Sequence, residues 1–196
     1  MKVIGVIGGS GSGKSTVSQI FSAHGLYPID CDRVARQIVE PGLPCLEKLV
    51  LAFGEDILDE KNGRLNRKML AQKAFSSPEN TEKLNRITHP TILEEVRRQM
   101  TEHADCAGIL VDGAALVESG FAEVCDVVVA VSSPFLLRLF RICRRDSLSL
   151  SGALLRLRAQ KPDSFYRAHA DYVLCNVGSL GCFTRRALRL LGQLLN

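Results

Sequence analysis

Short apolar runs recur along the chain, and they alternate with segments whose apolar residues are spaced three or four positions apart. A short continuous run of aliphatic residues is typical of a strand buried on both faces, whereas the wider spacing is typical of an amphipathic helix. The alternation predicts an α/β fold in which helices flank a parallel sheet of five strands. The predicted strands span residues 3–7, 26–29, 108–111, 127–131 and 172–175.

The second and third predicted strands are separated by about eighty residues with helical spacing and no strand pattern. Within this segment the Pro-Gly pair at 41–42 ends a short helix and the Asn-Gly pair at 62–63 marks a turn. A long helix is predicted to begin at 77–78 and to be interrupted by Pro90. We expect a helical insertion over about 33–105, close to the carboxyl edge of the sheet, where open α/β sheets bind ligands.

The first predicted strand leads directly into a glycine-rich segment. Residues 8–16 read Gly-Gly-Ser-Gly-Ser-Gly-Lys-Ser-Thr and contain the whole pattern G-x-x-x-x-G-K-[ST], and a helical pattern follows. Glycines let the backbone turn so that N–H groups and the positive end of the helix surround a phosphate. The strand and the helix on either side argue against a glycine-rich turn without a ligand. The predicted nucleotide-binding residues are Gly11, Ser12, Gly13, Lys14, Ser15 and Thr16.

The residue types at the end of this motif indicate how a nucleoside triphosphate would be handled. Lys14 is expected to reach the β- and γ-phosphates, and Ser15 is expected to offer its hydroxyl to Mg²⁺. The motif therefore predicts nucleotide binding, and it leaves open what happens to the γ-phosphate.

Composition limits the class of protein. A chain of 196 residues buries one good core but hardly a second independent one. Its 25 basic and 21 acidic residues are too balanced to predict binding of nucleic acid or a membrane, and no apolar stretch approaches spanning length. The seven cysteines show no C-x-x-C pair and no metal-ligand spacing, which favours free thiols in a reducing cytoplasm. The pattern of a signal peptide is not seen before the first predicted strand, which favours the same location. We expect a cytoplasmic protein of one domain, residues 1–196, with no obligate protein partner.

Positive charge is concentrated between residues 134 and 161, where six arginines and a lysine accompany a single acid, Asp146. A polar break at 145–149 separates two helical patterns, and Ser151 is the predicted cap of the second helix. Two helices that carry arginines on either side of a polar break make a plausible lid. We expect this lid over about 138–160.

Two arginines of the lid are the candidate catalytic cations. Arg141 and Arg145 are four residues apart, so they share one face of a helix. Guanidinium groups match phosphate oxygens and would stabilise the charge of the transition state as the lid closes. The alternative is a solvated helix surface, where most arginines lie.

Carboxylates follow the second and third predicted strands. Asp30 and Asp32 are expected to point toward the phosphate loop, although either could instead cap the following helix, above all Asp30. We favour Asp32 as the group that orients or deprotonates an acceptor hydroxyl. Asp112 closes an apolar strand in a Walker-B-like pattern and could hold Mg²⁺ through water. Glu118 lies six residues on, with substrate contact or an ordinary loop surface as its possible roles.

Taken together, these residues resemble those of the dephospho-CoA kinases, and the match extends over most of the chain. The phosphate loop alone is shared with many proteins, whereas the motifs that follow it are specific. These motifs are Ile29-Asp30-x-Asp32, Leu84-Asn85-x-Ile87 with His89-Pro90, Leu116-Val117-Glu118, Arg141 with Arg145-Asp146, Gln160, and Ala170-Asp171-Tyr172-Val173 with Asn176.

The resemblance implies a P-loop kinase fold and ATP-dependent phosphorylation of the ribose 3′-hydroxyl of dephospho-CoA, giving CoA and ADP. It implies that Asp32 is the base and that the insertion carrying His89 is the CoA-binding part. Glu118 lies within the matching motif and is a candidate for contact with metal or substrate. Asn176 falls where such kinases contact adenine. A lone histidine is more often structural, and only the resemblance gives His89 a role.

The chain departs from the usual pattern of that family in three places. Ser10 stands where an apolar residue is usual, Ala114-Ala115 replace Pro-Leu, and Arg138 occupies a position that is commonly Gln. None of these changes removes a phosphate ligand or the candidate base, so they bear on substrate affinity more than on identity.

Two alternatives remain at this point. Another small-molecule kinase, for nucleosides, nucleoside monophosphates or shikimate, would share every phosphate-handling residue and differ only in the insertion. A nucleotide switch would need a residue pattern to read its base, and a guanine-reading Asn-Lys-x-Asp is absent.

Overall fold

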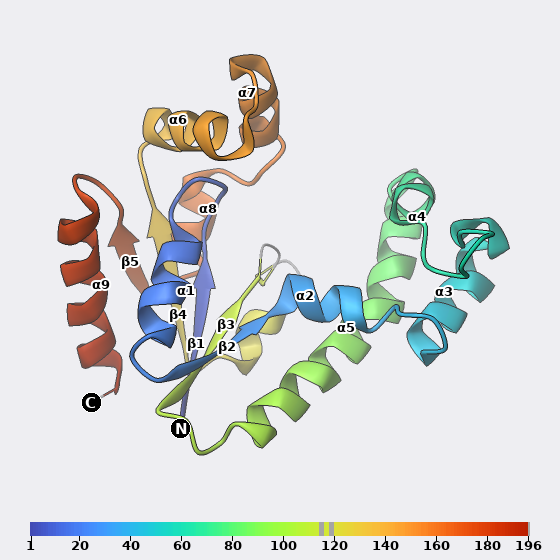
Figure 1. The fold of residues 1–196 in the computed structure, drawn as a ribbon, viewed down its shortest axis with the longest axis horizontal. Helices are drawn as coiled ribbons and strands as arrows, with labels where there is room; N and C mark the ends of the chain where they lie inside the picture. The colour runs from blue at the N-terminus through green and yellow to red at the C-terminus, as the bar shows by residue number, and fades with distance from the viewer. Residues whose placement is uncertain (114–115, 118–119, 196) are drawn as a thin grey trace. The chain divides into compact units, whose positions relative to one another are not determined.

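The computed structural model describes residues 1–113, 116–117 and 120–195, and in this part of the chain five parallel strands form one sheet (Figure 1). Their spatial order is β2-β3-β1-β4-β5. All five predicted strands and the α/β class are confirmed. The strands are β1 (Lys2–Ile7), β2 (Leu26–Asp30), β3 (Gly108–Asp112), β4 (Val127–Ser132) and β5 (Tyr172–Cys175).

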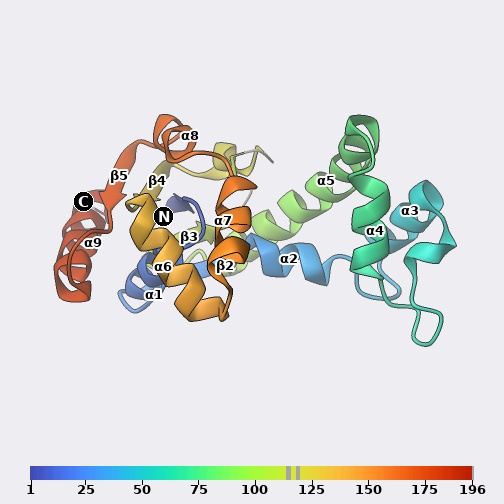
Figure 2. The ribbon, with the colours of Figure 1, turned by 90° about the horizontal axis from the view of Figure 1, so that it is seen from above.

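The sheet and the helices packed on it form one compact unit, made of residues 1–30 and the chain from His103 onward. Helices α1 and α9 cover one face of the sheet, and α8 lies on the other (Figure 2). The helical elements of this unit are α1 (Lys14–Ser22), η2 (Phe121–Val124), α6 (Phe135–Asp146), α7 (Leu150–Arg158), α8 (Asp163–Ala168) and α9 (Leu180–Leu195).

The core of this unit lies between β1 and the two helices α1 and α9. Ile4 of β1, Phe21 of α1 and Phe183 of α9 are completely buried in one hydrophobic cluster. Burying a large side chain of this kind contributes about 1.5–3 kcal/mol. This packing fixes the start of α1, and with it the loop that connects β1 to α1.

The strand register brings the carboxyl ends of the three strands β1, β2 and β3 to one edge. Asp112 of β3 pairs with Val6 of β1 on one side and with Asp30 of β2 on the other. The loop after β1 therefore begins beside Asp112, whereas β3 separates Asp30 from β1, so the expectation that the second strand lies beside the first was wrong.

Residues 31–102 form a second compact unit, which is helical. Its long helix packs against three shorter ones, and the predicted turn at 62–63 is present between residues 58 and 65, which form an isolated antiparallel bridge. The elements are α2 (Cys31–Gln37), α3 (Pro44–Phe53), η1 (Glu55–Ile57), α4 (Arg67–Ala74) and α5 (Pro78–Glu102).

Two local predictions were wrong. The helix α5 continues through Pro90 instead of stopping there. Proline removes one backbone N–H and bends a helix, but packing on the neighbouring helices keeps it continuous, and the bend of α5 is visible in Figure 1. The cap of α7 is Ser149, whose side chain accepts a hydrogen bond from Gly152 N, and not Ser151.

No helix in the described ranges combines the length and the apolar character needed to cross a membrane.

Candidate active site

The loop between β1 and α1 has the backbone of a phosphate cradle. Gly8, Gly11 and Gly13 all have positive φ angles, 141°, 74° and 109°, and Gly13 is the N-cap residue that precedes α1. The Lys14 ammonium donates a hydrogen bond of 2.5 Å to Gly8 O, so the lysine side chain extends from the start of α1 back to the first residue of the loop. Ser15 is exposed in the first turn of α1.

Ser12 supplies a direct indication that the loop is built for a ligand. The residue is 1% exposed, and its hydroxyl has no hydrogen-bond partner in the part of the chain that the structure describes. A buried hydroxyl without a partner is costly, and a phosphate oxygen would be a suitable acceptor for it. The cradle therefore fits the phosphates of a nucleotide.

The second half of the loop is held by two of the predicted site residues. Asn176, which follows β5, donates from Nδ2 to Ser12 O at 2.7 Å and is 8% exposed. Arg141 of α6 donates to Gly11 O at 3.1 Å and to Asn176 Oδ1 at 3.2 Å. The structure thus brings Arg141 and Asn176 together, and both contact loop carbonyls.

A matched pair of glycine variants tests this arrangement. A Cβ on Gly13 would lie 2.2 Å from Asn176 Nδ2, and a φ of 109° is unfavourable for alanine. Gly13→Ala is expected to lower ATP affinity about tenfold or more, measured by calorimetry, because Asn176 must move and its bond to Ser12 is lost. Gly120→Ala is the control: its φ of 76° is also unfavourable for alanine, but a Cβ there would meet no atom of the described residues within 4 Å, so it should bind ATP normally.

Asp112 lies at the edge where a metal bound to the phosphates would be expected. It accepts a hydrogen bond of 2.8 Å from the Ser18 hydroxyl, and Ser18 is three residues beyond Ser15 on α1. Among the described residues no group of three or more His, Cys, Asp or Glu side chains could hold a metal. Mg²⁺ is commonly held by only one or two protein groups together with substrate phosphates and waters, and the Ser15 hydroxyl and the Asp112 carboxylate fit this coordination.

Arg145 is paired with its neighbour in the last turn of α6. It donates from Nε and Nη2 to the two oxygens of Asp146, at 2.8 and 2.9 Å, and Arg156 donates to the same carboxylate at 2.7 Å. Hydrogen bonding to Arg145 holds the pKa of Asp146 below its usual value. Arg145 is exposed and Asp146 is partly exposed, so a phosphate could compete for Arg145 at little cost.

The other predicted residues belong to the helical unit or lie outside the described residues. Asp32 is exposed in the first turn of α2, which begins at Cys31, so Asp32 is not the residue that caps this helix. His89 is half-buried in α5, and burial lowers the pKa of its imidazole. Glu118 lies outside the described residues.

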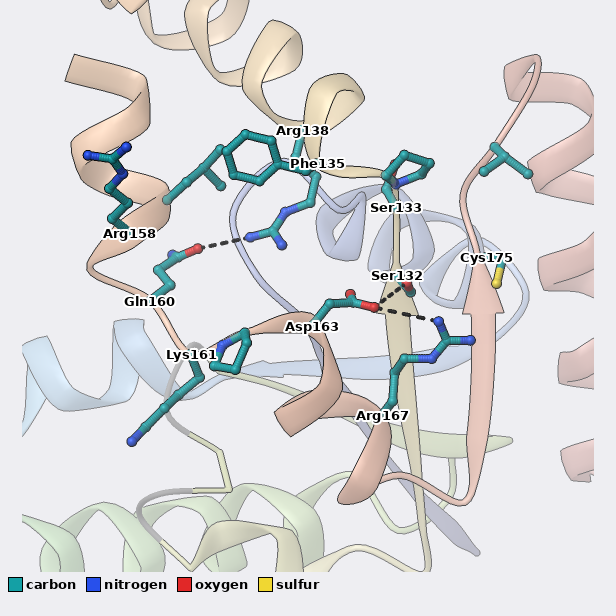
Figure 3. Close-up of a pocket in the computed structure, with 14 residues that line it drawn as sticks. Ser132, Ser133, Phe135, Arg138, Arg158, Gln160, Lys161, Asp163, Arg167 and Cys175 are labelled. Atoms are coloured by element: carbon teal, nitrogen blue, oxygen red, sulfur yellow. Dashed lines mark hydrogen bonds and ion pairs between the residues drawn. The ribbon is translucent and has the colours of Figure 1, made fainter. Parts of the chain in front are cut away.

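Some contacts of the loop were not expected from the sequence. Arg141 donates a hydrogen bond of 3.1 Å to the hydroxyl of Ser133, next to the loop. The Gln160 side chain donates a hydrogen bond to the hydroxyl of Ser10, in the loop itself. Gln160 also lines a cavity of about 610 Å³ bounded by α6, α8 and the ends of β4 and β5 (Figure 3). The resemblance to a family was the only signal for Gln160, and a serine after a strand gives no signal of its own.

A phosphate cradle at the carboxyl edge of a parallel sheet of this order, with arginines from the segment after β4, defines a P-loop kinase. The family model for dephospho-CoA kinase matches residues 2–181. The chain belongs to the dephospho-CoA kinase family, and it is an ATP-dependent kinase of coenzyme A biosynthesis.

Similar proteins support this assignment over the whole chain. A dephospho-CoA kinase of Corynebacterium efficiens is 44% identical over 195 residues, which cover 98% of this chain and 96% of the relative. The crystal structure of TT1252 from Thermus thermophilus has a TM-score of 0.85 at 31% identity and covers 100% of this chain and 98% of that one. The dephospho-CoA kinase from Campylobacter jejuni has a TM-score of 0.71 at 28% identity, covering 98% and 97% of the two chains.

The fold is shared more widely than the family. A shikimate kinase from Acinetobacter baumannii has a TM-score of 0.55 at 18% identity, covering 100% of this chain and 93% of that one, which is a likeness of fold alone. The alternative of another small-molecule kinase thus arose from a real similarity of architecture, and the family match decides between the two.

Proposed function

We propose that this chain transfers the γ-phosphate of ATP to the 3′-hydroxyl of the ribose of dephospho-CoA, giving CoA and ADP. The observation that carries this proposal is the family match over residues 2–181, which includes both the phosphate loop and the helical unit.

The phosphate loop would bind the triphosphate of ATP. The hydroxyl of Ser12 and the backbone of Gly11–Thr16 would donate to phosphate oxygens, and Lys14 would stabilise the charge that develops on the β- and γ-phosphates. The exposed Ser15 hydroxyl, and Asp112 through water, would hold Mg²⁺, which would supply positive charge to neutralise the phosphates. Arg145 would leave Asp146 for the transferred group when substrates are bound.

Asp32 would act as the base of the reaction. As the 3′-oxygen bonds to the γ-phosphorus and the bond to ADP breaks, an exposed carboxylate can accept the proton of the hydroxyl. We further propose that the insertion of about 33–105 binds dephospho-CoA and that its residue His89 is one of the contacts. Glu118, which follows β3, is proposed as a second contact. Residues 138–160 are proposed to act as a lid. Because burial lowers its pKa, the His89 imidazole would be neutral at neutral pH and would make a hydrogen bond rather than an ion pair.

The enzyme is proposed to act in the cytoplasm, which is consistent with the free thiols found among the described residues.

The position of the new phosphate tests the proposal. After incubation with Mg-ATP and dephospho-CoA, the product is expected to co-elute with CoA and to show a phosphorus resonance coupled to the ribose 3′ proton. Phosphate on another hydroxyl, or no phosphorylated product, would contradict the proposed reaction.

A further inference from the structure

Ser10, in the first half of the phosphate loop, is contacted by two segments that are far away in the sequence. Gln160, which follows α7, accepts from Ser10 N at 2.8 Å and donates from Nε2 to Ser10 Oγ at 2.7 Å. Arg138 of α6 donates from Nε to Ser10 O at 2.9 Å. The backbone N–H, the carbonyl and the hydroxyl of Ser10 are therefore all hydrogen-bonded.

Arg138 and Gln160 also contact each other. Arg138 Nη2 donates to Gln160 Oε1 at 3.3 Å, and Figure 3 shows the two side chains meeting at the wall of the cavity. They touch the loop on one side and line the cavity on the other. The three residues thus form a closed network of hydrogen bonds, which we call the Ser10 clamp.

The backbone of the loop is close to Arg138 on both sides of Ser10. A Cβ on Gly9 would lie 2.1 Å from Arg138 Nη2, and a Cβ on Gly11 would lie 2.7 Å from Arg138 O. Only glycines allow α6 to approach the loop in this way. The position of Arg138 therefore constrains the path of the loop around Ser10.

Burial of the Arg138 charge argues for a role other than stability. The side chain is 6% exposed, and burial lowers the pKa of its guanidinium, an effect that the charge of Asp163 opposes. A guanidinium stays protonated in proteins, and its hydrogen-bond acceptors in the clamp are a neutral carbonyl and a neutral amide. Burying a charge among neutral partners is costly, so a hydrophobic residue would serve the fold at least as well.

The clamp is separate from the contacts that hold the second half of the loop. Arg141 and Asn176 bind the carbonyls of Gly11 and Ser12, whereas Arg138 and Gln160 bind Ser10. Arg138 and Gln160 are also the two ends of the proposed lid, whose helices α6 and α7 share their own small hydrophobic cluster. Both ends of this helical pair are consequently attached to one residue of the phosphate loop.

We propose that Arg138 is a positioning residue for nucleotide binding, which together with Gln160 fixes the Ser10 peptide so that the loop can receive the phosphates of ATP. This inference rests on the proposed function for the identity of the nucleotide. Ser10 and Arg138 are two of the three places in which the chain departs from the pattern it resembles, so the clamp is a property of this sequence.

The test compares two arginines of the same helix. Arg138→Met keeps the length of the side chain and removes its donors, and it is expected to raise the KM for ATP about tenfold or more, because two hydrogen bonds to a charged group are lost. The KM for dephospho-CoA and the midpoint of thermal unfolding should change little. The control is Arg144→Met, which removes an exposed arginine of α6 and should leave all three values unchanged.

Gln160→Leu removes the clamp from its other end and supplies a second variant should Arg138→Met not fold. It is expected to raise the KM for ATP to a similar extent. The KM for ATP of the double variant should exceed that of the single variant with the higher KM by no more than about twofold. A KM for ATP within about twofold of the wild-type value in both single variants would overturn the proposal. A lower midpoint of thermal unfolding with an unchanged KM for ATP would also overturn the proposal.

Calorimetric titration with ADP measures the same effect without an acceptor. If the wild-type protein binds ADP but does not phosphorylate dephospho-CoA, the proposed function fails while the comparison of Arg138 with Arg144 still decides the role of the clamp. Equal ADP affinities in wild type, Arg138→Met and Gln160→Leu would contradict the clamp alone.

Discussion

Replacing Lys14 with alanine is expected to reduce turnover by about 10³-fold or more, because the reaction then loses the positive charge held at the β- and γ-phosphates. In the structure this ammonium lies against Gly8 O, at the start of the loop. The packing of α1 on the sheet depends on its buried residues Val17 and Phe21 and not on the charge of Lys14.

The measurement is kcat with saturating ATP and dephospho-CoA, together with a thermal unfolding curve. Lys61→Ala removes an exposed lysine of the helical unit and is the control for the loss of one charge. Undiminished activity in the Lys14 variant would show that the phosphates are not bound by this loop.

The second large effect is expected for Asp32→Asn. The amide cannot accept the proton of the ribose hydroxyl, so kcat should fall about 10²- to 10⁴-fold while ATP affinity is preserved. Asp32 is exposed in the first turn of α2, where a carboxylate also interacts favourably with the helix dipole. That contribution to stability is small and does not affect turnover.

Glu79→Gln is a suitable control, because Glu79 is also an exposed acid in the first turn of a helix of the same unit. It should lose a similar amount of stability and retain full turnover. If the Asp32 variant instead loses its affinity for ATP, Asp32 is a metal-binding or structural residue and not the base.

The arginines of α6 have two kinds of partner. Arg138 and Arg141, three residues apart, both bind carbonyls of the phosphate loop, whereas Arg145 lies in the last turn of the helix and is paired with Asp146. A movement of α6 would therefore act on the loop directly through two arginines. Of these three arginines only Arg145 is exposed, so it can change its partner at the lowest cost.

The sheet could be predicted from the sequence because its strands are continuous apolar runs with few competing interpretations. Each of the five runs became a strand, and the motif after the first run became a loop and a helix. The order of the residues along the chain therefore carried most of the information about the fold. It carried less about helix ends, since Pro90 lies inside α5 and Ser149, not Ser151, caps α7.

The contacts around the loop could not be predicted in the same way. Gln160 is 150 residues from Ser10, and Asn176 is 164 residues from Ser12, although each pair is joined by a hydrogen bond. Contacts of this length depend on the strand order and on the lengths of α6 and α7, which no local pattern fixes. The sequence identified Arg141 and Asn176 as site residues, but not that both bind loop carbonyls.

The orphaned hydroxyl of Ser12 shows what the structure adds to a motif. The G-x-x-x-x-G-K-[ST] pattern treats this position as variable, and the sequence predicted Ser12 as a nucleotide-binding residue only because it lies within the loop. Its burial without a partner in the described part of the chain points to a ligand that completes the loop.

The central claim is most directly tested by the release of ADP from Mg-ATP in the presence of a panel of acceptors: dephospho-CoA, AMP, UMP, shikimate and none. The account predicts turnover that is selective for dephospho-CoA, with CoA as the product. ADP release at the same rate with every acceptor, or a preference for shikimate or a nucleoside monophosphate, would contradict it.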